Sequence, residues 1–301
     1  MRRDRHVERW PFRIVDVFTD RPLAGNQLAV FEDASDIPEA TLQPLAREIN
    51  FAETVFMVEA RSGGDARIRI FTPENEVPFA GHPTLGSAVV LAAQLGKDRV
   101  VLETGRGMVP VRIETTGAAA RGVMEQPIPT VAPYPNAPEL LRALGVERFL
   151  LPVTVYDNGI AHVYVMLADP ADVATLEPDL AAVARLARDT DMPLIGVTVV
   201  AGSGTTWKTR MFAPADGVPE DAATGSAAGP LALHLVRRER IPWGTEIRIS
   251  QGVEIGRPSE LFARVLGDAG HIDRVEVSGY AVPVGGGWFD AALLRAELFE
   301  I

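Results

Sequence analysis

The sequence lacks cysteine altogether among its 301 residues. The chain can therefore form no disulfide, no thiolate metal site and no cysteine nucleophile. Lysine and arginine form no block, and the formal net charge of −11 disfavours binding to nucleic acid or to an anionic membrane surface. No apolar run approaches the roughly 18 residues of a membrane-spanning helix, and the basic start of the chain precedes no apolar stretch of a secretory signal. We therefore expect a soluble cytoplasmic protein.

Histidine is also scarce, with five residues in the chain. Their positions do not have the spacing of a metal site, so no metal is expected. His162 lies in the strand-like segment DNGIAHVYV, which is compatible with a place in the core or facing the cleft, and we favour the core. His82 is different, because it lies between Gly81 and Pro83 just before an apolar segment, a backbone setting that an ordinary surface histidine does not need.

The sequence does contain an internal repeat. RIFTPENEVP at 69–78 and RMFAPADGVP at 210–219 share the pattern R-x-F-x-P-x-x-x-V-P and lie 141 residues apart. Each is followed by a loop and a cluster of small residues, TLGSA at 84–88 and TGSAA at 224–228. The shared motif, its spacing and the similar segments that follow each copy indicate an internal duplication.

An apolar segment follows each cluster, at 88–96 and 229–238, and is rich in alanine, valine and leucine on every face. A helix of this kind is buried all round, and a mixed sheet curled around it would bury it. We therefore predict an α+β fold of two pseudo-symmetric domains, each a barrel-like mixed β-sheet around a central helix.

Strand-like runs and one amphipathic helix complete each half in the order β-β-α-β-β-α-β-β. The segment VAPYPNAP at 131–138 carries three prolines and predicts a linker. We predict a first domain at 1–128, with 279–301 returning to it, and a second domain at 129–278, with the active site in the cleft between them. The expected strands are 12–18, 26–31, 54–59, 67–71, 99–104 and 108–114, then 152–156, 161–166, 194–201, 207–212, 246–251 and 261–266, with the amphipathic helices at 37–50 and 176–189.

Both central helices start in turns that contain glycine and serine. A helix N-terminus presents free N–H groups and a partial positive charge, so two such starts facing one cleft would suit a small carboxylate. Gly81, Gly86 and Gly225 would let a ligand approach the backbone, and Ser87 and Ser226 can donate hydrogen bonds. The pattern alone is equally compatible with small residues that only permit tight helix packing.

Three further residues could carry acid or base chemistry. Glu53 lies beside apolar residues in INFAETVF, where partial desolvation would raise its pKa and make it a useful base. His82 and Asp221 each follow one copy of the repeat. The residues alone leave simpler interpretations open: an exposed Glu53, a His82 bonded to backbone, and an Asp221 that caps a turn.

Taken together, these segments resemble the PhzF family of isomerases, phenazine-biosynthesis-like proteins that share the diaminopimelate epimerase fold. The resemblance covers nearly the whole chain after residue 11. It implies no metal and no organic cofactor, a homodimer, and a small carboxylate-bearing substrate as the partner. The motifs that carry it are FRIVDVFTDRPLAGNQLAVF at 12–31, NFAETVF at 50–56, FTPENEVPFAGHPTLGSA at 71–88, EDAATGSAAGPLALHL at 220–235 and ISQGVEIGRPSEL at 249–261.

The resemblance also implies roles for single residues. Glu53 resembles the family's general acid/base, and His82 and Asp221 resemble two more polar groups at the reacting face. Ser226, with the backbone of Gly81, His82 and Gly225, would hold the substrate carboxylate, and Asn26 would line the cleft. Ala222 stands where many relatives have proline, a departure of little consequence.

The expected activity is isomerisation, in which acid/base catalysis shifts a proton along a small unsaturated acid. The epimerases of this fold use two cysteines, so the absence of cysteine excludes that form of racemisation. A racemase, epimerase or dehydratase with other bases remains an alternative. A non-catalytic protein that binds small acids is the second alternative.

Overall fold

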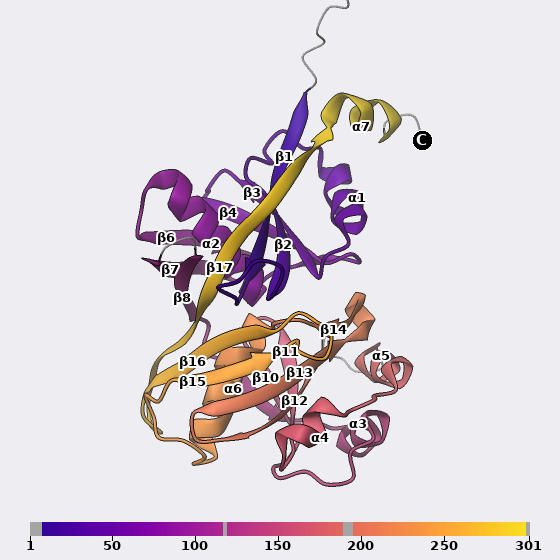
Figure 1. Ribbon diagram of the computed structural model, residues 1–301, viewed down its shortest axis with the longest axis vertical. Coiled ribbons are helices and arrows are strands. Elements are labelled where there is room, and N and C mark those ends of the chain that lie inside the picture. The colour runs from indigo at the N-terminus through magenta and orange to yellow at the C-terminus, as the bar shows by residue number, and fades with distance from the viewer. Residues whose placement is uncertain (1–7, 117–118, 189–194, 299–301) are drawn as a thin grey trace, which may run out of the picture.

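The computed structural model describes residues 8–116, 119–188 and 195–298. The fold is α+β, with two pseudo-symmetric domains that each wrap a barrel-like mixed sheet around a central helix, as predicted. Figure 1 shows the first domain above the second, with the yellow strand β17 (Ile272–Asp290) running from one into the other. The basic residues 1–7, including His6, and the start of the strand expected at 194 lie outside the described residues.

The first domain follows the predicted order and adds strands that the sequence pattern did not reveal. The strand β8 (Ala119–Gln126) was not expected, and it pairs with both β7 and β17. The other elements are β1 (Arg9–Val17), β2 (Asn26–Phe31), α1 (Glu39–Ile49), β3 (Glu53–Val58), β4 (Ala66–Phe71), β5 (Glu76–Val77), α2 (Gly81–Leu95), β6 (Arg99–Thr104) and β7 (Gly107–Thr116).

The second domain repeats this plan around α6 (Gly225–Arg237). Three short helices cover its outer side, at the lower right of Figure 1. Its elements are β9 (Thr130–Pro133), α3 (Ala137–Leu144), β10 (Thr154–Asp157), β11 (Ala161–Met166), α4 (Pro170–Ala174), α5 (Leu180–Arg188), β12 (Ile195–Ser203), β13 (Thr206–Ala213), the 3₁₀ turn η1 (Pro214–Asp216), β14 (Val218–Asp221), β15 (Ile247–Gln251) and β16 (Ser259–Gly267).

The two central helices are buried on every face, as their composition predicted. Every residue from 81 to 92 in α2 and from 225 to 236 in α6 is buried. The surrounding strands contribute a hydrophobic core that is continuous between the domains, because it includes residues packed around both helices. A smaller cluster lies under α3 and α5, and another lies under α1.

The strand β17 joins the two domains. Its first part pairs with β16, its middle with β8, and its last part with β1, where Ala281 lies opposite Val17 and Asp290 opposite Arg9. Residues 279–290 thus pair with strands of the first domain. The domain boundaries at residues 128 and 278 stay a prediction. Among the described residues, no helix is long and apolar enough to cross a bilayer.

The structure corrects two expectations. The segment 131–138 is not a linker, because Thr130–Pro133 forms β9, which pairs with β10, and Tyr134 is buried in the second domain. Only Pro133 lies in this strand, at its last residue, whereas Pro135 and Pro138 follow it, so the prolines did not prevent pairing. The central helix α2 begins at Gly81, not near residue 88.

Gly86 and Ser87 therefore lie inside α2 and take no part in its start. A β-carbon on Gly86 would come within 2.7 Å of the side chains of Leu28 and Val17. This glycine serves the close packing of helix and sheet, which was the simpler of the two interpretations that the sequence left open.

The packing around β17 gives a stability prediction. A β-carbon on Gly279 would meet the buried ring of Phe18, with Cε1 at 3.0 Å, whereas a β-carbon on Gly285 in the same strand meets nothing within 4 Å. We expect Gly279→Ala to lower the free energy of unfolding by about 1–3 kcal/mol through overpacking. The matched control Gly285→Ala should change it by less than about 0.5 kcal/mol or stabilise slightly. Urea denaturation measures both, and equal effects would contradict the packing described here.

Candidate active site

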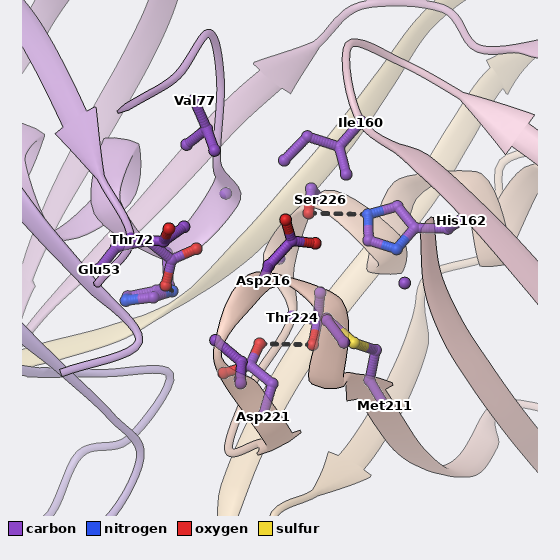
Figure 2. Close-up of a pocket in the computed structure, with 16 residues that line it drawn as sticks. Glu53, Thr72, Val77, Ile160, His162, Met211, Asp216, Asp221, Thr224 and Ser226 are labelled. Carbon is purple, nitrogen blue, oxygen red and sulfur yellow. Dashed lines mark hydrogen bonds and ion pairs between the residues drawn. The ribbon is translucent and has the colours of Figure 1, made fainter. Parts of the chain in front are cut away.

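The N-termini of α2 and α6 meet at the bottom of a pocket between the domains. A β-carbon on Gly81 would lie 2.6 Å from the Cα of Gly225, so the two backbones touch at positions where only glycine fits. The residues that line the pocket come from both domains (Figure 2). They are Glu53, Thr72, Val77, Gly81 and His82 from the first, and Ile160, His162, Gly196, Met211, Ala213, Asp216, Val218, Asp221, Thr224, Gly225 and Ser226 from the second.

Neither helix start has a side-chain cap among the described residues. Ala80 precedes α2 and cannot supply a cap, and Thr224 precedes α6 without capping it. Both helices span several turns, so each brings a partial positive charge to the pocket through its dipole. Two uncapped N-termini that meet in one pocket present backbone N–H groups to it, an arrangement of the kind that binds anions in proteins.

Glu53 and His82 face each other on the first-domain side. Glu53 begins β3, and its Oε2 lies 3.6 Å from Nδ1 of His82, the second residue of α2. Burial raises the pKa of Glu53 well above its usual range, with added repulsion from Asp221 and Asp216. Burial also lowers the pKa of His82 to about 3. Both shifts favour the neutral forms, so the pair consists of a proton-exchanging carboxyl group and a neutral imidazole.

Asn26 connects His82 to Asp221 across the two domains. Its Nδ2 donates to Oδ1 of Asp221 at 2.7 Å and to the carbonyl of Ala223 at 3.0 Å, and lies 3.1 Å from Nδ1 of His82. Asn26 is buried behind the pocket wall, whereas the resemblance implied that it lines the cleft. The Nε2 of His82 has no hydrogen-bond partner among the described residues, and the tautomer of the neutral imidazole decides which ring nitrogen donates.

Asp221 is held rigidly from the other side. Its Oδ2 accepts from the hydroxyl of Thr224 at 2.7 Å, and the buried Gln251 donates to both the Asp221 carbonyl and Thr224 Oγ1. Burial raises the pKa of Asp221, while the hydrogen bonds from Thr224 and Asn26 work against that rise. The turn role that the sequence suggested for Asp221 and its place in the pocket are therefore both observed.

Ser226 is oriented by His162. The Oγ of Ser226 lies 2.9 Å from Nε2 of His162, and Asn158 donates to the Ser226 carbonyl at 2.9 Å. His162 is buried as expected from its strand, and burial lowers its pKa to about 3. It also lines the pocket, however, and its Nδ1 has no partner among the described residues.

The structure thus gathers Glu53, His82, Asp221, Gly81, Gly225 and Ser226 in one pocket, with Asn26 behind them. Sequence reasoning missed Asp216, and for His162 it favoured the core over the cleft, whereas the structure shows both. A signal for Asp216 was present, because Asp216 and Asn75 occupy the same position in the two copies of the repeat. Among the described residues, no group of three or more metal-ligating side chains was found.

A model of the family described as phenazine biosynthesis-like protein matches residues 15–287. The chain belongs to this family. It is 49% identical to the trans-2,3-dihydro-3-hydroxyanthranilate isomerase of Pseudomonas aeruginosa, over 88% of this chain and 94% of that protein. This likeness makes the chain an isomerase of the family.

Solved structures of the family share the fold. A PhzF-family protein of Bacillus anthracis has a TM-score of 0.81 at 22% identity, covering 94% of this chain and 99% of that one. A protein of Pseudomonas aeruginosa described as a predicted epimerase has a TM-score of 0.78 at 28% identity with the same coverage. The PhzF-family fold thus extends over nearly all of this isomerase.

The burial of Glu53 predicts a pH-dependent effect on stability. Its pKa in the folded isomerase lies above the unfolded value, so the folded state binds more protons and loses stability as pH rises above about 4.5. We expect Glu53→Gln to unfold at higher urea concentration than wild type at pH 8 and at a similar concentration at pH 4. Each unit by which the Glu53 pKa in the folded state exceeds that in the unfolded state corresponds to about 1.4 kcal/mol of unfolding free energy.

The control for this comparison is Glu48→Gln, which removes one negative charge from the exposed side of α1. Its effect on the urea midpoint should not grow between pH 4 and pH 8. If Glu53→Gln were no more stable than wild type at pH 8, the folded protein would not disfavour the ionised Glu53, and the burial argument would be wrong.

Proposed function

We propose that this protein isomerises trans-2,3-dihydro-3-hydroxyanthranilate, or a closely similar unsaturated cyclic amino acid, by moving a proton between two carbons. The observation that carries the proposal is the meeting of two uncapped helix N-termini beside Glu53, whose side chain is 15% exposed. Such a pocket supplies an anion site and a proton-exchanging carboxyl group in contact with one small molecule. The likeness to a named isomerase supports the choice of substrate.

The substrate carboxylate binds to the helix ends in this proposal. The N–H groups of Gly81, His82, Gly225 and Ser226 and the hydroxyl of Ser226 donate to it. His162 Nε2–H donates to Ser226 Oγ, which leaves the serine proton free to point at the substrate. A ligand held at this end has its ring directed toward Glu53 and the apolar wall formed by Val77, Ile160, Met211, Ala213 and Val218.

Glu53 then acts as the base. Its ionised carboxylate removes a proton from a carbon that the conjugated system acidifies, and the electrons of the broken C–H bond move into that system. The imidazole N–H of His82 stabilises the negative charge that develops, a preorganised electrostatic effect. Protonated Glu53, or the His82 and Asp221 pair, returns a proton to another carbon, so that the product differs only in the positions of a double bond and a hydrogen.

The duplication argues against a racemase with a second carboxylate base. The pairings Thr54 with Phe71 in the first domain and Val197 with Phe212 in the second make Gly196 the counterpart of Glu53. The second domain therefore presents no side chain where the first presents its base. A racemase would have to use His82 or Asp221 as the second base, and product stereochemistry distinguishes it from the isomerase.

The central test is Glu53→Gln with trans-2,3-dihydro-3-hydroxyanthranilate in D₂O. The amide cannot accept the substrate proton, so kcat should fall by about 10²–10⁴-fold and deuterium incorporation should be lost. The measurement is product formation together with mass-spectrometric detection of deuterium, and Glu48→Gln is the matched control. Undiminished exchange in Glu53→Gln would remove Glu53 as the base, and binding of the acid by wild type without exchange would favour a non-catalytic protein.

The proposal includes a homodimer located in the cytoplasm, which is supported by the resemblance to the family and by the sequence expectations alone. Light scattering after size-exclusion chromatography should give a mass twice that of the chain, independent of protein concentration in the micromolar range. A mass equal to one chain would contradict the dimer while leaving the proposed reaction untouched.

A further inference from the structure

Two loops that correspond in the duplication meet at the pocket. Residues 72–77 of the first domain and 213–218 of the second occupy the same position in the repeat. They approach each other closely, because a β-carbon on Gly217 would lie 3.4 Å from Cγ of Glu74. Asn75 and Asp216 are the corresponding residues, and the Asn75 side chain forms a hydrogen bond with the Asp216 carboxylate.

Asp216 brings a third carboxylate to the pocket. Figure 2 shows it in the space between Glu53 on one side and Ser226 with His162 on the other. Glu53 and Asp221 also line the pocket, and none of its lining residues in the described part of the chain is lysine or arginine. Each of these three groups would, when ionised, repel a substrate carboxylate and attract a positive group on the substrate.

The three carboxylates differ in how they are already engaged. Asp221 is held by Asn26 and Thr224, and Glu53 is the proposed base beside His82. Among the described residues, Asn75 is the one hydrogen-bond partner of the Asp216 side chain, which belongs to the half-buried turn η1. Glu53 Oε2 also lacks a hydrogen bond among the described residues, but Glu53 is already assigned to proton transfer. Asp216 is therefore the carboxylate of the three that has no other role and can accept hydrogen bonds from a ligand.

A second polar atom on the second-domain wall lacks a partner. His162 is 1% exposed, and its Nδ1 is buried without a hydrogen bond among the described residues. A proton on Nε2, donated to Ser226, makes Nδ1 a hydrogen-bond acceptor. Buried polar groups are almost always paired, so an unpaired acceptor in a pocket wall points to a donor supplied by a ligand.

We propose that Asp216 and His162 form a subsite for the amino group of the substrate, and that Asp216 is a specificity-determining residue of this enzyme. The inference rests on the proposed function, because the carboxylate at the helix ends fixes which side of the ligand faces this wall. An ammonium group donates up to three hydrogen bonds, and the Asp216 carboxylate and His162 Nδ1 accept two of them. The first domain has Asn75 where the second has Asp216, so this acceptor is a property of the second loop.

The test compares two unreactive probes, 2-aminocyclohexanecarboxylate and cyclohexanecarboxylate, which differ only in the amino group. Isothermal titration calorimetry gives the Kd of each. Wild type should bind the amino acid about 10- to 100-fold more tightly, the range expected for hydrogen bonds to a charged group. Asp216→Asn should lose most of this preference, and Asp216→Glu should keep it.

Two further variants separate the subsite from general damage to the pocket. Asp20→Asn removes a carboxylate that is 64% exposed, and it should leave the preference unchanged. His162→Phe removes Nε2, which positions Ser226, and should therefore weaken the binding of both probes. The same substitution removes Nδ1, so it should weaken the binding of the amino acid more than the binding of cyclohexanecarboxylate.

Equal binding of the two probes by wild type, or an unchanged preference in Asp216→Asn, would overturn the subsite. Neither result concerns proton transfer. Turnover of trans-2,3-dihydro-3-hydroxyanthranilate by wild type and its loss in Glu53→Gln test the proposed function separately. Wild type that shows the preference for the amino acid but no turnover would contradict the reaction and leave the subsite standing.

Discussion

The contact between the first turns of α2 and α6 is the constraint on which the rest of the site depends. Gly81 and Gly225 bring the two backbones together so closely that a side chain at position 81 would overlap the opposite helix. The contact places two uncapped N-termini side by side and fixes the distance between the domains at the pocket. Because Glu53 and His82 come from one domain and Asp221 and Ser226 from the other, their relative placement follows from this contact.

The duplication supplies the symmetry of the site, and its divergence supplies the chemistry. Gly196 stands where the first domain has Glu53, and Ser226 stands at the second position of α6 where α2 has His82. The first domain thus contributes a carboxyl group and an imidazole, while the second contributes a hydroxyl. Two domains with nearly equivalent backbones but different side chains give a pocket with two chemically distinct sides.

Burial gives these groups their properties. It raises the pKa of Glu53 and Asp221 and lowers the pKa of His82, so each is biased toward its neutral form. A carboxyl group biased in this way is a stronger base once ionised and a ready proton donor once protonated. The helix ends supply a positive potential to the pocket, whose wall in the described structure contains no cationic side chain.

The sequence by itself determined the repeat, the two buried central helices, the α+β class and the residue types of the site. These features are local, because a helix buried all round and a glycine-rich helix start can be recognised within about ten residues. Only the tertiary structure decided that α2 begins at Gly81, that β17 passes between the domains, and that Asp216 and His162 reach the pocket. Those features depend on strand pairings and contacts between residues far apart in the chain, such as Asn26 with Asp221, which no local pattern encodes.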